Sequence, residues 1–236
     1  MIVAVLQARM SSARLPGKVM APLCGEPMIV RQLERIRRAR TLAKVVVATS
    51  RDPSDDPLAE HLTLRGQAVH RGALQDVLGR VAEAVRQHTA GGQCTHVVRL
   101  TADCPLADPE VIDEAVRLAL ASRAAYTSNC ERRTYPDGLD VEVVTADTLF
   151  RAAREAEDPY EREHVTPFVR RRPERFPQAH LIRPTDLSAL RWTVDRPEDL
   201  AFVRRVYQAL HPADTGFTTQ DVLDWLAQGD RAVAAA

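Results

Sequence analysis

Short apolar runs alternate with longer stretches of helical period over the first half of this chain. Strand-like runs occur at residues 2–6, 45–48 and 96–100, and amphipathic stretches separate them. Parallel strands need long crossover connections, which helices usually supply. The pattern therefore predicts an α/β fold in which a mostly parallel sheet is flanked by helices on both faces, giving three layers, α/β/α.

The second half continues the alternation less regularly. Pro109 stands in the favoured first-turn position of a helix, and Thr145 is a candidate N-cap. No repeat and no linker rich in Gly, Pro or Ser interrupts the chain, so we expect a single domain over residues 1–236. Further strands are expected at residues 124–128, 141–144, 179–183 and 190–194, helices at about 28–40, 56–65, 74–88, 109–121, 149–156, 162–172, 198–210 and 220–228, and a turn at Gly91-Gly92.

The composition excludes several classes of protein. Lys and Arg number 32, as do Asp and Glu, so the net charge is zero, whereas nucleic-acid binders rely on a net basic surface. The longest apolar runs fall far short of the roughly 20 residues that span a bilayer. We expect no signal peptide before the first strand, and a cytoplasmic protein without nucleic-acid or membrane partners. Four cysteines without a CxxC pair are expected to be free thiols: Cys24, Cys94, Cys104 and Cys130.

Cations are concentrated near the N-terminus. Residues 1–44 contain nine cations and two acids, and the loop at 7–18 contains Arg9, Arg14 and Lys18 without any acid. Ligands of open α/β sheets bind beyond the carboxyl ends of the strands, where this loop lies. Its cations and backbone N–H groups could surround a polyphosphate. The alternative interpretation is a solvated, flexible basic loop.

Lysine is rare in this chain. Lys18 and Lys44 are the only lysines among the 32 cationic side chains, an excess of arginine that a genome-composition bias explains most simply. Arginine can replace a solvated charge but not a compact ammonium at a crowded site, so Lys18 stands out, while Lys44 has no assigned role. Neither the P-loop signature nor GxGxxG is present, which disfavours ATPases of that class and typical dinucleotide dehydrogenases.

The segment QARMSSARLPGKVM, residues 7–20, closely resembles the N-terminal signature of cytidylyltransferases that activate acidic sugars. These include 3-deoxy-manno-octulosonate and acylneuraminate cytidylyltransferases, and the spore coat polysaccharide biosynthesis protein F group is the most similar. The resemblance spans nearly the whole chain in the family's order, and its first and last motifs are the most specific. The other motifs are VVVATS (45–50), RLTADCPL (99–106), YPDGLDVEV (135–143), YEREHVTPF (160–168) and LRWTVDRPEDL (190–200).

The resemblance implies a Rossmann-like, nucleotide-diphospho-sugar transferase-like fold. Residues 1–128 would form the nucleotide-binding half, and residues 129–236 the half for sugar binding and dimerisation. The implied reaction is Mg²⁺-dependent transfer of CMP from CTP to an acidic sugar with release of pyrophosphate, in surface or spore-coat polysaccharide biosynthesis. Such chemistry depends on positioning and charge neutralisation more than on a protein nucleophile. A homodimer is expected, since family members commonly dimerise.

Two aspartates are candidate metal ligands. Asp103 and Asp195 each follow an apolar strand-like run and should lie at a strand's carboxyl end. Carboxylates converging there offer the oxygen ligands that Mg²⁺ takes alongside substrate phosphates. The simpler interpretation is a turn or cap residue, and Asp195 in particular could cap the helix that begins near Pro197. The resemblance favours the metal, because the family's metal-binding acids fall at matching places.

The resemblance also implies which residues contact the nucleotide. Lys18 is the best candidate for stabilising charge at the reacting phosphate, and the predicted catalytic set is Lys18, Arg14, Asp103 and Asp195. The predicted nucleotide-binding residues are Arg9, Ser11, Ser12, Arg14, Lys18, Thr49, Asp76 and Asp103.

Residues of the second half are assigned to the sugar. Asp140 and Glu142 would share one face of a strand and bind sugar hydroxyls, and one of them could accept a proton or help to place the metal. Arg162 would bind the sugar carboxylate. The alternatives are a solvated strand face after a turn at Asp137-Gly138 and an ion-paired surface helix. The predicted sugar-binding residues are Asp137, Asp140, Glu142, Arg162 and His164.

The chain departs from its relatives at three places. Asp76 is the only acid in the helix entry at 71–78, Ala102 replaces a common glycine, and Ser50 stands where octulosonate enzymes tend to carry an acid. The serine at position 50 weakens the inference that this protein uses the same sugar as the octulosonate enzymes. One alternative function is a glycosyltransferase that consumes a nucleotide sugar, which has no obvious need for the triphosphate loop. Another is a nucleotide sensor or inactive partner subunit, against which the retention of Lys18, Asp103 and Asp195 argues.

Overall fold

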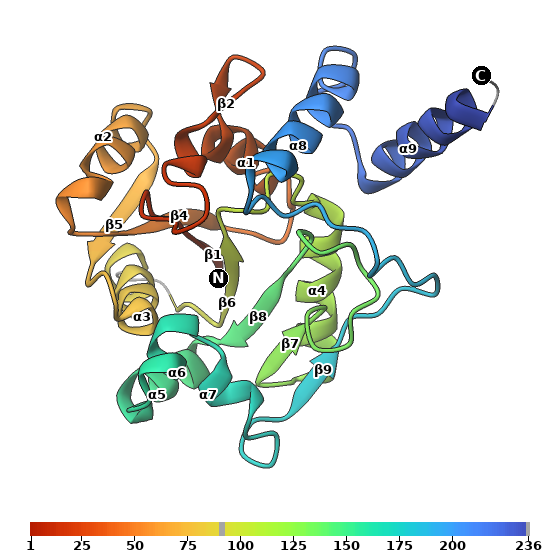
Figure 1. Ribbon diagram of the computed structural model, residues 1–236. Helices are drawn as coiled ribbons and strands as arrows, with labels where there is room; N and C mark the ends of the chain where they lie inside the picture. Colours follow the sequence, from red (N-terminus) through yellow and green to blue (C-terminus); the bar gives the residue numbers. More distant parts are fainter. Residues whose placement is uncertain (90–92, 235–236) are drawn as a thin grey trace.

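The computed structural model describes residues 1–89 and 93–234, so the expected turn at Gly91-Gly92 lies outside the described residues. Within them, a seven-stranded sheet has the order β5-β4-β1-β6-β8-β7-β9 (Figure 1). The first four strands in this order run parallel, whereas β8 is antiparallel to both of its neighbours and β9 is parallel to β7. The strands are β1 (Ile2–Gln7), β4 (Lys44–Ser50), β5 (Ala68–Gly72), β6 (His96–Thr101), β7 (Tyr126–Ser128), β8 (Glu142–Thr145) and β9 (Gln178–His180).

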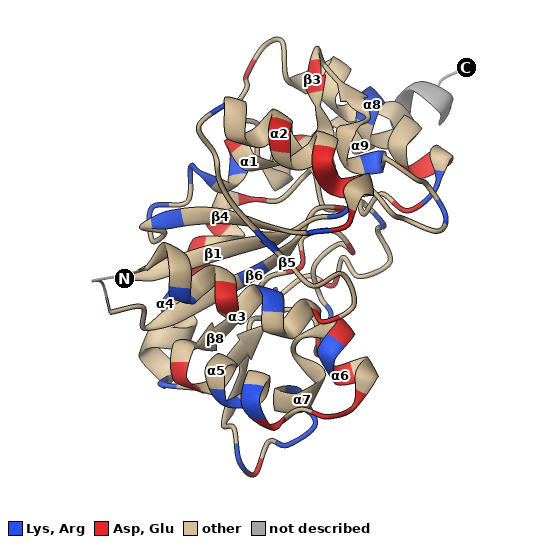
Figure 2. Cartoon of the chain, turned by 90° about the vertical axis from the view of Figure 1, so that its left-hand side faces the viewer, with Lys and Arg blue, Asp and Glu red and all other residues tan. Residues whose placement is uncertain are grey.

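Helices cover both faces of the sheet, and this confirms the predicted three-layer α/β fold. On β1, Ala4 and Leu6 pack against one group of helices, whereas Val3 and Val5 pack against the other. Because side chains alternate across a strand, one continuous apolar run serves both cores. Figure 2 shows that charged residues lie mainly on the helices and loops. The first face is covered by α1 (Met28–Ile36), α2 (Asp56–Leu64), α4 (Pro109–Ser122) and α8 (Pro197–Leu210), and the second by α3 (Val77–His88), α5 (Ala146–Glu155) and α7 (Pro167–Arg170).

Short elements complete the fold. A hairpin of β2 (Pro22–Leu23) and β3 (Glu26–Pro27) precedes α1, and α9 (Thr219–Ala234) follows α8. The remaining pieces are the 3₁₀ turns η1 (Lys18–Met20) and η2 (Pro53–Asp55) and the helix α6 (Pro159–His164). Among the described residues, no helix has both the length and the apolar character that crossing a membrane requires.

Capping side chains set the helix starts. Thr145 accepts a hydrogen bond from the backbone N–H of Thr148 at the start of α5, and Pro109 occupies the first turn of α4, as predicted. The helix expected from residue 74 begins only at Val77, because the carboxylate of Asp76 caps it through the N–H of Gly79.

Two further predictions were wrong in part, and one strand was missed. Residues 190–194 form no strand, although Trp192 and Val194 are buried: their apolar alternation reflects packing into the core. The helix expected at 162–172 is divided into α6 and α7 by Val165, which has a φ of 73°. The edge strand β5 was missed because its sequence, AVHRG, is too polar to signal a strand.

Lys44 has a structural role. Its Nζ donates a hydrogen bond of 2.9 Å to the carbonyl oxygen of His88, the last residue of α3. A cation at this position satisfies a helix carbonyl that has no partner within the helix and interacts favourably with the helix dipole. Lys44 lies at the opposite end of β4 from Ser50, so it is remote from the predicted site.

Gly138 allows two segments of the second half to cross closely. Its φ is 112°, and a Cβ atom there would lie 2.5 Å from the backbone nitrogen of Thr193. The carbonyl oxygen of the preceding residue, Asp137, accepts hydrogen bonds from the N–H groups of Trp192 and Thr193. A side chain at residue 138 would therefore push away the segment that leads to Asp195.

We expect Gly138→Ala to lower the free energy of unfolding by about 2–5 kcal/mol, because it combines an unfavourable φ with a backbone clash. Gly66→Ala is the control, since Gly66 also has a positive φ of 70° but a Cβ atom added there would meet no atom within 4 Å. This control should cost about 1 kcal/mol. Urea unfolding of both variants measures the difference, and equal losses would refute the close approach at Gly138.

Candidate active site

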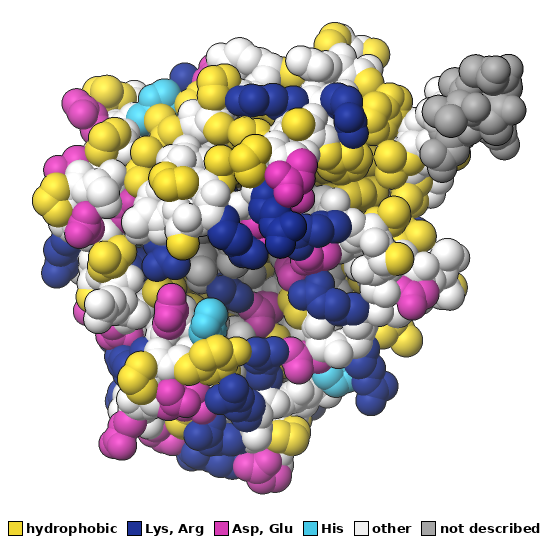
Figure 3. Space-filling model, in the orientation of Figure 1, with side chains coloured by type: hydrophobic (Ala, Val, Ile, Leu, Met, Phe, Trp, Pro, Cys, Tyr) yellow, Lys and Arg dark blue, Asp and Glu magenta, His cyan; other side chains and the backbone are white. Residues whose placement is uncertain are grey.

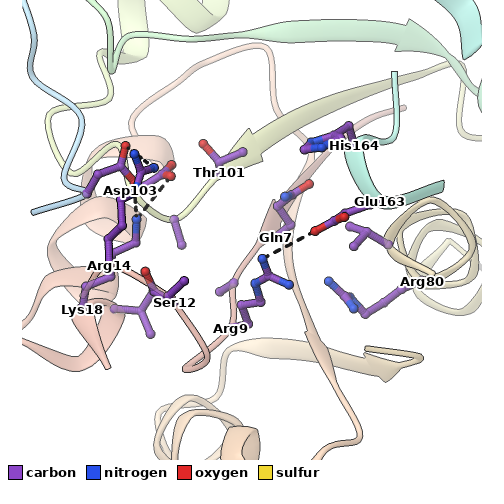
Figure 4. A pocket seen from close by; sticks show the side chains of 16 residues that line it. Gln7, Arg9, Ser12, Arg14, Lys18, Arg80, Thr101, Asp103, Glu163 and His164 are labelled. Atoms are coloured by element: carbon purple, nitrogen blue, oxygen red, sulfur yellow. Dashed lines mark hydrogen bonds and ion pairs between the residues drawn. The ribbon is translucent and has the colours of Figure 1, made fainter. Parts of the chain in front are cut away.

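A polar cleft of about 360 Å³ lies at the carboxyl ends of β1 and β6. Figure 3 shows cationic and acidic side chains gathered around a hollow in the middle of this face. Figure 4 shows the side chains that point into the cleft from both walls. The segment at 7–18 supplies five polar or cationic side chains to its lining: Gln7, Arg9, Ser12, Arg14 and Lys18. The other lining residues are Ala8, Ala13, Val19, Val77, Arg80, Thr101, Ala102, Asp103, Glu163, His164 and Asp195.

Lys18 lies at the floor of this cleft. Its Nζ donates hydrogen bonds to the carbonyl oxygen of Val194 at 2.6 Å and to the carboxylate of Asp195 at 3.0 Å. The same nitrogen is 3.4 Å from a carboxylate oxygen of Asp103. The ammonium is buried and joins the two predicted metal-binding acids. Three donors converging on three acceptors match the geometry of an ammonium, whereas a planar guanidinium would not fit there.

Backbone contacts bring the two aspartates together. The carbonyl oxygen of Asp103 accepts hydrogen bonds from the N–H of Val194 at 2.8 Å and from the hydroxyl of Thr193 at 3.2 Å. The segment before α8 is therefore fastened to the end of β6. The carboxylates of Asp103 and Asp195, 92 positions apart in the chain, consequently reach the same ammonium.

Asp195 does not cap α8, in contrast to the simpler interpretation of its sequence position. The N–H groups of Asp195 and Arg196 both donate to Asp199, which closes the start of the helix. The Asp195 carboxylate instead accepts hydrogen bonds from Lys18 and Arg191 and forms an ion pair with Arg14. Burial raises the pKa of Asp195, but the hydrogen bonds and charges of these cations outweigh burial and hold the pKa below its usual value.

The two carboxylates fit a metal that also binds a substrate. Within the described part of the chain, no group of three or more His, Cys, Asp or Glu side chains could hold a metal ion alone. Two carboxylates that face a cleft are the donor set expected for Mg²⁺, which usually keeps only one or two protein carboxylates and takes phosphate oxygens and waters besides. The Lys18 ammonium between them shows that this position accommodates positive charge.

An ion pair links the two walls of the cleft, and the opposite wall adds a further cation, Arg80. Arg9 lies 3.8 Å from Glu163 of α6, so this ion pair spans the mouth of the cleft (Figure 4). Arg80 of α3 also lines the cleft, and its buried Nε has no hydrogen-bond partner within residues 1–89 and 93–234. A buried guanidinium N–H without an acceptor is costly, so an anionic ligand in the cleft would improve its environment.

A second polar pocket of about 170 Å³ adjoins the first, sharing Thr101 and His164 with it. Glu142 is buried in its wall and binds Arg99, while the hydroxyls of Tyr126 and Thr166 donate to the same carboxylate at 2.5 and 2.6 Å. The predicted alternative of a solvated strand face is therefore wrong for Glu142. The pocket is lined by Arg99, Thr101, Cys130, Arg133, Asp140, Glu142, Tyr160, His164, Thr166 and Arg170.

The charged side chains of this second pocket differ in how readily they could bind a ligand. Burial raises the pKa of Glu142, but the charge of Arg99 and the hydroxyl hydrogen bonds lower it below the usual value. The negative charge of Glu142 is therefore balanced by the groups that already contact it. Burial raises the pKa of Asp140 above its usual value despite the nearby Arg133. Arg170 pairs with Glu131 through one terminal nitrogen, and its side chain is 30% exposed in the lining of the pocket. Arg170 can therefore bind a further anionic partner.

Five predicted site residues, all within the described residues, lie outside both pockets. Arg162 binds Asp76 through two hydrogen bonds, of 3.0 and 2.7 Å, and donates to two backbone carbonyls as well. Asp76 caps α3, and Thr49 is fully buried in β4. The five residues are Ser11, Thr49, Asp76, Asp137 and Arg162.

The sequence reasoning missed several residues of the clefts. Arg99 stands inside the RLTADCPL motif, and Thr166 inside YEREHVTPF, so the motifs themselves were signals for both. Arg80, Arg133 and Arg170 had no such signal, because arginine is common in this chain and only the fold shows which copies face a pocket.

Comparison with known proteins assigns the chain to a family. A model of the family described as cytidylyltransferase matches residues 3–210. Spore coat polysaccharide biosynthesis protein SpsF of Bacillus subtilis is 34% identical over 218 residues, which cover 88% of this chain and 86% of that protein. A cytidylyltransferase structure from Leptospira borgpetersenii superposes with a TM-score of 0.90 at 30% identity, covering 98% of this chain and 95% of that one.

A more distant structure has the same fold. CMP:2-keto-3-deoxy-manno-octonic acid synthetase complexed with CTP superposes with a TM-score of 0.62 at 17% identity, over 88% of this chain and 98% of that one. The sequence match along nearly the whole chain, together with the sheet order and the basic cleft at its carboxyl edge, leads to one assignment. The chain belongs to the cytidylyltransferase family.

Proposed function

We propose that this protein transfers CMP from CTP to an acidic sugar, with release of pyrophosphate, in a Mg²⁺-dependent step of surface polysaccharide biosynthesis. The observation that carries the proposal is the Lys18 ammonium, held between Asp103 and Asp195 in a cation-lined cleft. Family membership, the CTP complex of the distant structural relative and the polysaccharide role in the name of the Bacillus relative support it.

The first cleft suits a nucleoside triphosphate. Arg9, Arg14 and Arg80 line it at different depths, and Arg14 is well exposed at its edge. Cations spread along a polar cleft can bind successive phosphates through charge-assisted hydrogen bonds. In this proposal residues 1–128 supply most of the nucleotide site, while residues 129–236 contribute the sugar site and the Asp195 carboxylate.

Asp103 and Asp195 would hold Mg²⁺ at this cleft. When bound, the ion supplies positive charge that polarises the phosphoryl oxygens and favours departure of pyrophosphate. Lys18 contacts both carboxylates. With substrate present, its ammonium is within reach of an α-phosphate next to them, where it would stabilise the negative charge that develops on the phosphoryl oxygens.

The second pocket suits the sugar. It opens beside the first and shares His164 and Thr101 with it, so a ligand bound there would lie against the nucleotide. Arg170 lines this pocket with a side chain that is 30% exposed, so it is a better partner for a sugar carboxylate than Arg162, which lies outside the pocket and binds Asp76 and a backbone carbonyl. Asp140 can accept hydrogen bonds from sugar hydroxyls.

The proposed reaction is a single displacement at phosphorus. A sugar hydroxyl oxygen forms a bond to the α-phosphorus, and the bond from that phosphorus to the oxygen of the β-phosphate breaks. The products are the CMP-sugar, pyrophosphate and the proton of the hydroxyl. The protein's contribution is to align the two substrates and to neutralise charge.

Pyrophosphate release tests this function directly. Each of the four common nucleoside triphosphates would be incubated with Mg²⁺ and a panel of acidic and neutral sugars. The proposal predicts pyrophosphate with CTP and an acidic sugar, and none without the sugar. A glycosyltransferase would instead release a nucleotide from a nucleotide sugar, and that result would replace the proposed function.

We expect Lys18→Arg to lower kcat on the order of 100-fold, because a guanidinium cannot occupy the site between the two carboxylates and the Val194 carbonyl. Lys44→Arg is the matched control: it makes the same substitution at the other lysine, which caps α3 far from the cleft. Steady-state kinetics of both variants decide the role, and wild-type kcat in Lys18→Arg would remove Lys18 from the reaction centre.

Asp103→Asn and Asp195→Asn should each lower Mg²⁺-dependent turnover on the order of 100-fold or more, because a neutral amide is a weak ligand for a hard divalent cation. Mg²⁺ titration of activity and thermal unfolding would be measured on the same samples, so that loss of activity is separated from loss of fold. Full activity in both folded variants would refute the metal assignment.

Arg170→Met should raise KM for the acidic sugar about tenfold while leaving KM for CTP nearly unchanged, because it removes the cation proposed for the sugar carboxylate. Arg154→Met is the control, since Arg154 is an exposed arginine of α5 that lies outside the lining of both pockets. Equal KM values for the sugar in the two variants would show that Arg170 does not bind it.

A further inference from the structure

Asp55 is a fully buried carboxylate that lies outside both pockets and has no place in the reaction described above. It stands at the N-cap position of α2, yet its side chain makes no cap hydrogen bond. One carboxylate oxygen accepts the backbone N–H of Met10 at 2.6 Å. The other accepts the N–H of Ser50 at 3.1 Å and the hydroxyl of the same serine. A residue at a helix N-cap position thus binds the loop after β1 in place of its own helix.

The bond to Met10 is the first of a series that leads to Lys18. The carbonyl oxygen of Met10 accepts hydrogen bonds from the N–H of Ser12 at 3.0 Å and from that of Gly17 at 2.9 Å. Gly17 has a φ of 71° and directly precedes Lys18. The loop is therefore closed upon Met10, and Met10 is fastened to Asp55.

We infer that Asp55 is a positioning residue for Lys18: it anchors the loop at 7–18 through Met10 and so holds the Lys18 ammonium at the floor of the cleft. Its contact is with the backbone of Met10, so it acts on the loop's path and does not touch a substrate. The expected effect of this anchor on catalysis rests on the proposed role of Lys18. The anchoring itself can be measured without any substrate.

Both side-chain oxygens of Asp55 are needed as acceptors in this arrangement. Two backbone N–H groups and one hydroxyl point at its two oxygens. A carboxylate accepts all of them, whereas the amide of Asn offers one accepting oxygen and directs an NH₂ group at the remaining donor. Asp55→Asn preserves the size of the side chain and disrupts the anchor.

Asp113 supplies an unusually close control. It is also buried, 6% exposed, and one of its oxygens accepts the N–H of Arg40 at 3.0 Å. Its other oxygen accepts the N–H and the hydroxyl of Thr41 at 2.9 and 2.6 Å. The donor set is the same as that of Asp55, but the anchored segment joins α1 to β4 and does not line either pocket.

Hydrogen exchange and kinetics on Asp55→Asn and Asp113→Asn test the inference. Exchange at the amides of Met10 and Gly17 should be at least about tenfold faster in Asp55→Asn and unchanged in Asp113→Asn. Trypsin should cleave Asp55→Asn faster after Arg14, whose side chain is 61% exposed. With CTP and sugar, kcat/KM should fall on the order of 10- to 100-fold in Asp55→Asn and less than twofold in Asp113→Asn.

Each outcome decides a distinct point. Unchanged exchange at Met10 and Gly17 in Asp55→Asn would overturn the anchor. Faster exchange with wild-type kcat/KM would overturn its effect on Lys18, as would equal kinetic losses in the two variants. If the wild-type protein turned over no CTP, the proposed function would fail, while exchange and proteolysis would still test the anchor.

Gly17→Ala tests the same series from its other end, should Asp55→Asn not fold. A side chain at this positive φ strains the residue whose N–H binds Met10, so exchange at Met10 and cleavage after Arg14 should increase. Gly25→Ala is its control, because Gly25 has a φ of 83° and nothing within 4 Å, in a hairpin outside the loop. Equal exchange at Met10 in these two variants would contradict the inference.

Discussion

The site depends on one electrostatic arrangement, a single ammonium between two carboxylates. Asp103 and Asp195 come from different segments, and without a cation their charges would repel each other. Lys18 provides that cation, and Arg14 and Arg191 also balance the charge of Asp195. The surrounding structure can be understood as the set of backbone contacts that bring these three side chains to one point.

Those contacts come from both halves of the chain. The end of β6 holds the segment before α8 through the carbonyl oxygen of Asp103, and Gly138 lets the neighbouring turn approach that segment closely. On the other side, the loop after β1 closes on Met10. The irregular second half thus completes a site whose cations come mainly from the first. Zero net charge is compatible with this because the positive charge is local.

Sequence reasoning identified the residues whose position follows from strand order. Arg14, Lys18 and Asp103 lie in the first loop or just beyond β6, so the carboxyl edge of a parallel sheet gathers them in one cleft. Asp195 was expected at a strand end, but the described residues directly before it form no strand, and it reaches the cleft because Asp103 binds the segment before it. Arg162 was assigned to the sugar, but it pairs with the Asp76 cap, a contact between residues 86 positions apart. No pattern marked Asp55 either, because an Asp before a helix ordinarily predicts a cap. The edge strand β5 was missed because its sequence has no apolar period, and its pairing with β4 in the folded chain defines it as a strand.

The most direct measurement of the central claim follows the phosphorus atoms of CTP. Reactions with α-labelled and γ-labelled CTP, Mg²⁺ and an acidic sugar would be separated into sugar product and pyrophosphate. Attack at the phosphorus beside Lys18 predicts that the α-label enters the sugar product and the γ-label leaves in pyrophosphate. A γ-label in the sugar, or an α-label that never reaches it, would contradict this account.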